Sequence, residues 1–130
     1  MTNLAYLPPQ PVMSRGDWPT LGNMISSGKR VVVFMDKGLE GRKEANAEFV
    51  LPEFKMVWED TYDPTDISFP CKVERTAGPL APREQLSLIN QNLNANLLPL
   101  VGEHGFVVPD RLNSPRTNSV DRWVSCSSHI

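Results

Sequence analysis

Histidine is scarce in this sequence, and its scarcity argues against one common kind of active site. The 130 residues include two histidines. Acid–base catalysis by a histidine pair needs two imidazole rings that converge on one substrate from fixed positions. His104 lies in a glycine-flanked loop, and His129 lies beside the C-terminus, where chains commonly fray. We therefore expect no catalytic pair from these two residues.

Cysteine is equally scarce, and the short motifs of common cofactor sites are missing. Cys71 and Cys126 can form at most one disulfide, and their spacing fits no zinc motif. Without knowledge of the compartment, one disulfide and two free thiols remain open alternatives. The sequence has no glycine-rich phosphate loop, Gly-x-Ser-x-Gly elbow or His-Glu-x-x-His pair. We therefore predict no metal and no cofactor.

The sequence also lacks an excess of positive charge and any long apolar run. Lysine and arginine total 13 against 15 acidic residues, a net charge of −2, so nothing attracts nucleic acid or an anionic membrane. No run approaches the roughly 20 apolar residues that a transmembrane helix needs. The N-terminal residues lack the basic and apolar regions of a signal peptide. We predict no nucleic-acid partner and no transmembrane segment, and the localisation stays unknown.

The remaining composition describes one small folded domain with many loops. Hydrophobic residues make up 40% of the chain, which is enough for a core. The 12 prolines are about twice the ordinary share of roughly 5%. Three of them, Pro8, Pro9 and Pro11, exclude a helix near the N-terminus. Residues 1–16 are therefore predicted to form a loop or linker.

A helix is predicted directly after this segment. Pro19 suits the first helical turn, where its missing N–H has no helical partner to lose. Leu21, Met24 and Ile25 share one helical face. Gly28 suits a left-handed residue that ends the helix.

An unbroken apolar run, residues 31–35, follows the helix. Such a run is typical of a strand buried on both faces, and strands of that kind belong to parallel sheets. Asp36 stands at its carboxyl end, the edge where ligands and catalytic groups gather in α/β folds. Residues 37–47 read as a polar surface loop.

A second strand candidate, residues 54–58, runs into an acidic cluster. Glu59, Asp60, Asp63 and Asp66 are dense enough to suggest a hard cation, but their spacing is not that of an EF-hand loop. We favour a solvated acidic turn over a cation site.

The last third of the chain is harder to interpret. Residues 82–98 have apolar spacing typical of a helix, but residues 86–89 can also form a short buried strand followed by the polar run 90–92. Residues 99–115 are predicted to be a loop. Residues 118–121 could cap a closing helix.

Four segments resemble one family. WPTLGNMISSGKRVVVFMD, then MVWEDTYDPTDISFPCKVER, then LSLINQNLN and NSPRTNSV, are similar in order and spacing to the second half of the fungal phosphatidylinositol-specific phospholipase C-like phosphodiesterases. Members of that family are distorted TIM barrels. The resemblance implies an α/β fold, a partial (truncated) TIM-type β/α barrel with parallel strands over residues 17–121. It makes residues 31–35, 55–58 and 86–89 consecutive strands, and it leaves 122–130 as a divergent tail.

The resemblance implies cleavage of a phosphodiester, classically in a glycerophosphoinositide, by a histidine pair on early strands. Neither His104 nor His129 matches such a position, so we expect a chain that lacks the catalytic half. What carries over is the rim of the substrate pocket, at the carboxyl ends of the strands. We predict as substrate-binding residues Asp36, Glu59, Asp60, Tyr62, Asn90 and Asn92.

Three hypotheses follow. The chain is a catalytically incomplete half-barrel, or a non-catalytic ligand-binding or interaction module derived from that fold, or one part of an enzyme built from two complementary chains. Family members are commonly secreted, and this chain shows no signal. A half-barrel leaves open sheet edges and uncovered apolar faces, so we expect a marginal fold that is either partly molten or stabilised by self-association.

Overall fold

The structure is a computed structural model that describes residues 3–37, 48–68, 71–98, 106–117 and 126. The chain divides into two compact units. Unit 1 contains Met1–Trp58 and Thr76–Leu86, and unit 2 contains Glu59–Arg75 and Ser87–Ile130.

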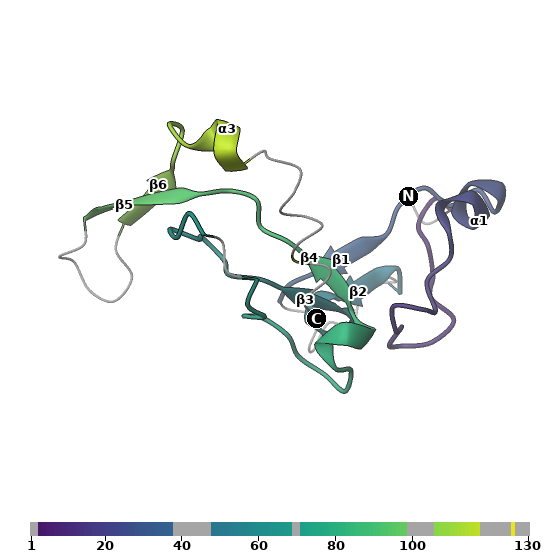
Figure 1. The fold of residues 1–130 in the computed structure, drawn as a ribbon. Helices are drawn as coiled ribbons and strands as arrows, with labels where there is room; N and C mark the ends of the chain where they lie inside the picture. The colour runs from purple at the N-terminus through teal and green to yellow at the C-terminus, as the bar shows by residue number, and fades with distance from the viewer. Residues whose placement is uncertain (1–2, 38–47, 69–70, 99–105, 118–125, 127–130) are drawn as a thin grey trace. The chain divides into compact units, whose positions relative to one another are not determined.

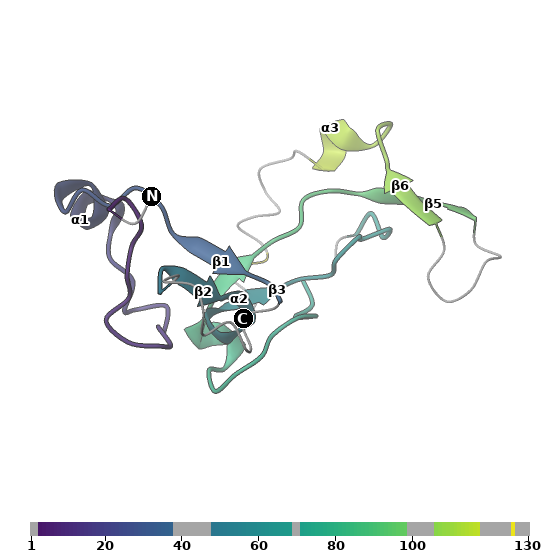
Figure 2. The same cartoon turned by 180° about the vertical axis from the view of Figure 1, so that it is seen from behind.

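The chain is built from short helices and short strands, as the ribbon shows from both sides (Figures 1 and 2). The described strands form three two-stranded sheets, β1–β2, β3–β4 and β5–β6. This mixture agrees with an α/β class. Within the described residues, no helix is both long and apolar enough to pass through a lipid bilayer. In chain order the elements are α1 (Leu21–Ser26), β1 (Val33–Met35), β2 (Val50–Pro52), α2 (Glu53–Met56), β3 (Val57–Glu59), a 3-10 helix (Pro82–Glu84), β4 (Leu86–Leu88), β5 (Asn94–Leu98), β6 (Phe106–Pro109) and α3 (Ser114–Thr117).

Helix α1 confirms the predicted helix and its stop, but Pro19 precedes the N-cap Thr20 and does not lie in the first turn as predicted. Thr20 caps the helix because its hydroxyl accepts a hydrogen bond from the Asn23 N–H at 3.2 Å. Gly28 has φ +74°, the left-handed conformation that glycine adopts without steric penalty. The apolar face is largely uncovered, since Leu21 is 78% and Ile25 60% exposed. The spacing of the apolar residues therefore predicted the helix correctly. Its apolar face packs against few of the residues that the structure describes.

The strand after α1 is shorter and less buried than predicted. Val31 forms only an isolated parallel bridge with Ala5, and β1 begins at Val33. All three residues of β1 are half-buried, so the expectation of burial on both faces is wrong. The bridge draws part of the N-terminal segment into the fold, since the Tyr6 N–H donates to the Val31 carbonyl at 2.8 Å.

Strand β2, which sequence patterning did not identify, pairs in parallel with β1, and Phe34 lies opposite Leu51. The predicted strand at 55–58 is only partly present. Residues 53–56 form α2, and the extended conformation begins at Val57. Glu53 in the first turn and Lys55 in the last turn favour this short helix because each charge complements the helix dipole at its own end.

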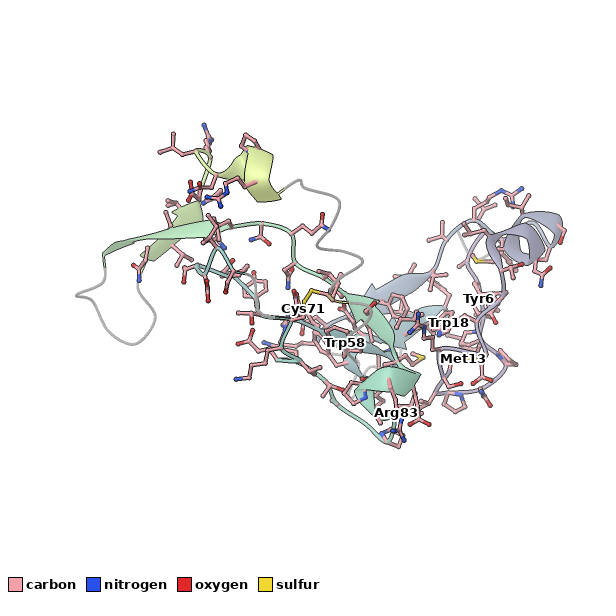
Figure 3. All side chains as sticks on the ribbon, viewed as in Figure 1. Tyr6, Met13, Trp18, Trp58, Cys71 and Arg83 are labelled. Atoms are coloured by element: carbon pink, nitrogen blue, oxygen red, sulfur yellow. A yellow bond between two sulfur atoms is a disulfide. The ribbon has the colours of Figure 1, made fainter. Side chains whose placement is uncertain are left out.

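The core of unit 1 is small and rich in sulfur and aromatic groups. Met13, Leu51 and Met56 are buried. Trp18 lies over them between two rings, with centroids 6.0 Å from Tyr6 and 5.7 Å from Phe34. The sticks in Figure 3 show Tyr6, Met13 and Trp18 gathered in one region.

The structure of residues 82–117 decides between the helix and the strand that the sequence left open. Residues 86–88 form β4, so the strand interpretation is right and the long helix over 82–98 is wrong. The expected burial of this strand is wrong, because Ser87 and Leu88 are exposed. The predicted loop at 99–115 is confirmed at residues 110–113. It is wrong at residues 106–109, where β6 pairs with β5 in an antiparallel rather than the predicted parallel direction, and from Ser114, where α3 begins. The predicted loop at 38–47 and the cap at 118–121 lie outside the described residues.

The open question of the cysteines is answered within unit 2. Cys71 and Cys126 form a disulfide with Cα atoms 5.2 Å apart across a separation of 55 residues. Cys126 is buried and Cys71 is half-buried.

The core of unit 1 is the subject of the first prediction. Met56→Ala removes a fully buried side chain, and we expect it to lower the free energy of unfolding by about 2–5 kcal/mol through lost burial and a cavity. Leu21→Ala is the matched control, because Leu21 is 78% exposed, and its change should stay within about 0.5 kcal/mol. Urea unfolding followed by tryptophan fluorescence measures both. Equal losses for the two variants would contradict this description of the core.

Candidate functional site

Two acidic residues at the end of β3 are buried, although the sequence favoured a solvated turn. Glu59 is 2% and Asp60 5% exposed, whereas Asp66 is exposed as predicted. The difference arises because β3 is buried along its whole length and carries its last carboxylate with it. The Asp60 N–H then donates to the Leu88 carbonyl at 3.2 Å, which holds the following residue against the end of β4.

Glu59 is paired with Arg75 through both main chain and side chain. The Glu59 N–H donates to the Arg75 carbonyl at 2.9 Å, and the Arg75 N–H donates to the Glu59 carbonyl at 3.2 Å. The Arg75 Nε and Nη2 atoms both contact Glu59 Oε2. A buried carboxylate needs such a cation, because burial of an unpaired charge is strongly unfavourable.

Asn90, just beyond β4, connects the two buried carboxyl groups. Its side-chain Nδ2 donates to Glu59 Oε1 at 2.9 Å, and its main-chain N–H donates to Asp60 Oδ1 at 2.7 Å. The same Nδ2 lies 3.4 Å from the Thr61 carbonyl oxygen. Both Glu59 oxygens are thereby engaged, one by an amide and the other by a guanidinium.

Tyr62 forms the exposed side of this cluster. The Arg75 guanidinium carbon lies 5.0 Å from the centre of the Tyr62 ring, a cation–π distance. The Tyr62 N–H donates to Glu74 Oε2 at 2.6 Å, which orients the residue. Tyr62 is 59% exposed, and the Arg75 side chain is 32% exposed. The ring and the guanidinium are therefore both partly accessible from solvent.

A second amide fixes the residues that follow. Asp63 has φ +52°, an uncommon backbone conformation for a residue other than glycine. The Asn94 side chain donates to Asp63 Oδ1 at 3.1 Å, and the Asn94 N–H donates to the Pro64 carbonyl at 2.8 Å. These two bonds hold the turn that begins with Tyr62.

The two buried carboxyl groups differ in their electrostatic surroundings. Burial raises the pKa of Asp60 above its ordinary value of 3.8, and the neighbouring Glu59 charge raises it further, while the hydrogen bonds from Asn90 oppose the shift. Glu59 has the Arg75 cation beside it. The end of β3 thus combines a charge-paired carboxylate with a second carboxyl whose ionisation is disfavoured.

We use the name polar cluster for Glu59, Asp60, Tyr62, Glu74, Arg75 and Asn90. Four of the six residues predicted from sequence belong to it. Asn92 is exposed, and Asp36 is an exposed residue of unit 1, directly after β1. The assignment of all six residues as substrate-binding stays a prediction.

Sequence reasoning missed Arg75 and Glu74, which lie in an irregular segment. One signal was available, because buried carboxylates need a cation and the next basic residues after the acidic run are Lys72 and Arg75. Among the described residues, no group of three or more His, Cys, Asp or Glu side chains could hold a metal ion. His104 and His129 lie outside the described part of the chain.

The polar cluster generates the second prediction. Because the folded-state pKa of Asp60 is raised, its contribution to stability is complete below the unfolded pKa and is lost as pH rises through the folded pKa. Asp60→Asn cannot ionise but can still accept the Asn90 N–H. We expect this variant to lose less stability than the natural chain as pH rises from about 4 towards neutral.

Asp66→Asn is the control, because the pKa of Asp66 is shifted in the opposite direction from that of Asp60. Hydrogen bonds from Ser68 lower the Asp66 pKa, so its contribution is present above the unfolded pKa and is lost on acidification. Unfolding free energies measured in denaturant at several pH values distinguish the two variants. Identical pH profiles for Asp60→Asn and the natural chain would contradict the assignment.

Comparison with known proteins shows the family of this chain. The PI-PLC X family model, described as PI-PLC X 1, matches residues 1–130. The PI-PLC X domain-containing protein 1 of Arthroderma benhamiae is 37% identical over 112 residues, which cover 85% of this chain and 33% of that protein. An uncharacterized secreted protein of the same organism is 35% identical over 125 residues, which cover 92% of this chain and 26% of that protein.

This chain therefore spans about a third and about a quarter of the lengths of those two relatives. No solved structure shows significant similarity to it. The match over all 130 residues, together with the identity to the first relative, shows that the chain belongs to the PI-PLC X family.

Proposed function

We propose that this chain carries the substrate-pocket rim of a phospholipase C-like phosphodiesterase, and that it binds a phosphodiester ligand of the glycerophosphoinositide type without hydrolysing it. Family membership supports the substrate class. The observation that carries the proposal is the polar cluster at the carboxyl end of β3, where Glu59 and Asn90 hold the partly exposed Arg75 beside Tyr62.

The chemistry of the cluster suits such a ligand. A guanidinium is a planar donor that matches the oxygen atoms of a phosphate. The exposed Tyr62 ring offers an apolar face and a hydroxyl beside it. Glu59 is too deeply buried to meet a ligand itself, so its role is to position Arg75.

The proposal includes a partial TIM-type barrel as the scaffold. The parallel pairing of β1 with β2 and the parallel bridge between Ala5 and Val31 support that arrangement. In such barrels, binding residues lie at the carboxyl ends of strands, and the polar cluster follows β3 and β4 in the same way.

The absence of turnover is proposed from the histidine content. The family's acid–base pair lies on early strands, and the resemblance matches neither of the two histidines of this chain to such a position. Without a general base and a general acid, a factor of roughly 10²–10⁴ is lost for each group. Two alternatives remain as outcomes of the test, an enzyme completed by a second complementary chain and an interaction module that binds no phosphodiester.

The third prediction concerns turnover. A fluorogenic inositol phosphodiester incubated with the purified chain should give no rate above that of the Asp36→Ala, Asp60→Ala double variant. Turnover that disappears in the double variant would show that the chain is catalytic after all. Turnover that appears only after addition of a second, complementary part of the domain would support a two-chain enzyme.

The fourth prediction concerns binding. Titration calorimetry with glycerophosphoinositol should show saturable binding that Tyr62→Ala and Arg75→Ala each weaken by roughly tenfold or more. Leu112→Ala is the control, because Leu112 is 92% exposed and belongs to the same unit. Absence of saturable heat with the natural chain would favour the interaction module.

We also propose self-association, as the sequence predicted from open sheet edges. Exposed apolar side chains in unit 1 support it, since Leu4, Leu7 and Ile25 are each about half or more exposed. Sedimentation velocity over a wide concentration range should show the average mass rising with concentration. A constant monomeric mass would contradict this part of the proposal.

A further inference from the structure

The segment from Glu59 to Arg75 is a loop whose two ends are joined at its base. The Glu59 N–H donates to the Arg75 carbonyl at 2.9 Å, and the Glu74 N–H donates to the Glu59 carbonyl at 2.9 Å. The Glu59–Arg75 ion pair lies at the same place. We call this segment the 59–75 loop. Its base therefore coincides with the centre of the polar cluster.

The two halves of the loop are held by different kinds of contact. Asn94 holds the first half, through Asp63 and the Pro64 carbonyl. The second half carries Cys71, which is bonded to Cys126. Cys71 comes shortly before Glu74 and Arg75 in the sequence, so the disulfide restrains the half of the loop that supplies the cation and the Tyr62 hydrogen-bond acceptor.

We propose that the Cys71–Cys126 disulfide is a redox-sensitive restraint on the polar cluster, and that its reduction loosens the Glu59–Arg75 base and the Tyr62–Glu74 contact while unit 1 keeps its structure. The restraint has a physical basis. A cross-link over 55 residues removes many conformations from the open chain. Without it, the hydrogen bonds at the base, the Glu59–Arg75 ion pair and the contact of Arg75 with Tyr62 must hold this half of the loop without a covalent restraint.

Reduction proceeds by exchange with a dithiol. A thiolate of the reductant attacks the sulfur of Cys71, which is half-buried, rather than that of Cys126, which is 3% exposed. The S–S bond breaks, a mixed disulfide forms on Cys71, and the Cys126 thiolate leaves and takes a proton. The second thiol of the reductant then displaces Cys71 as a thiol. The dithiol ends as a cyclic disulfide, and the protein has gained two electrons and two protons.

The division into units gives the test an internal control. The reporters are the main-chain N–H groups of Tyr62 and Glu74, which donate to Glu74 Oε2 and to the Glu59 carbonyl. The control reporter is the Tyr6 N–H in unit 1, which donates to the Val31 carbonyl at 2.8 Å. All three are described, hydrogen-bonded groups whose exchange with solvent requires local opening.

The experiment is amide hydrogen exchange on the full chain before and after treatment with dithiothreitol, with a thiol assay to confirm release of two thiols. We expect exchange at Tyr62 and Glu74 to accelerate by roughly tenfold or more, and exchange at Tyr6 to change by less than about twofold. Unchanged exchange at Tyr62 and Glu74 in fully reduced protein would overturn the proposal. An equal acceleration at Tyr6 would also overturn it, because the disulfide would then stabilise the whole chain rather than the loop.

The Cys71→Ser, Cys126→Ser double variant provides an independent measurement. It should show the fast exchange of the reduced chain at Tyr62 and Glu74, and dithiothreitol should have no further effect on it. A variant that exchanges like the oxidised chain would contradict the proposal, and so would one in which Tyr6 has lost protection. No ligand is involved in the readout, so a negative result would leave the proposed binding function to its own test.

Discussion

The buried carboxylate of Glu59 is the constraint on which unit 2 depends. At 2% exposure it has almost no contact with water, and an unpaired charge in that position would be strongly destabilising. The chain supplies partners from two distant segments, Arg75 at one oxygen and Asn90 at the other. Satisfying this one group therefore holds together the end of β3, the end of β4 and the 59–75 loop.

The same constraint explains the arrangement of the exposed groups. Because Glu59 fixes Arg75, the guanidinium lies at a defined place beside the Tyr62 ring. Glu74 and Asn94 then orient the residues around that ring through hydrogen bonds to main-chain and side-chain atoms. A surface that is rigid before a ligand arrives loses less conformational entropy on binding. The buried network thus gives Tyr62 and Arg75 the order that a binding site requires.

Local patterns in the sequence predicted those features that local physics decides. Helix α1 and the left-handed Gly28 follow from residues that are close in sequence. The placement of polar residues after strands also brought Glu59, Asp60 and Asn90 together correctly. What failed depends on distant partners. Burial of Glu59 needs Arg75, and the conformation of residues 53–56 cannot be inferred from an apolar pattern that suits either a strand or a short helix.

A double-mutant cycle between Glu59 and Asn90 tests the central role of the carboxylate most directly. Unfolding free energies of Glu59→Gln, Asn90→Ala and the double variant give the coupling between the two side chains. If the buried network is as described, the coupling should reach about 0.5–3 kcal/mol, because both residues belong to one hydrogen-bonded network. If the stability losses of the two single variants sum to that of the double variant within about 0.3 kcal/mol, the account is contradicted, because the effects of independent residues add in that way.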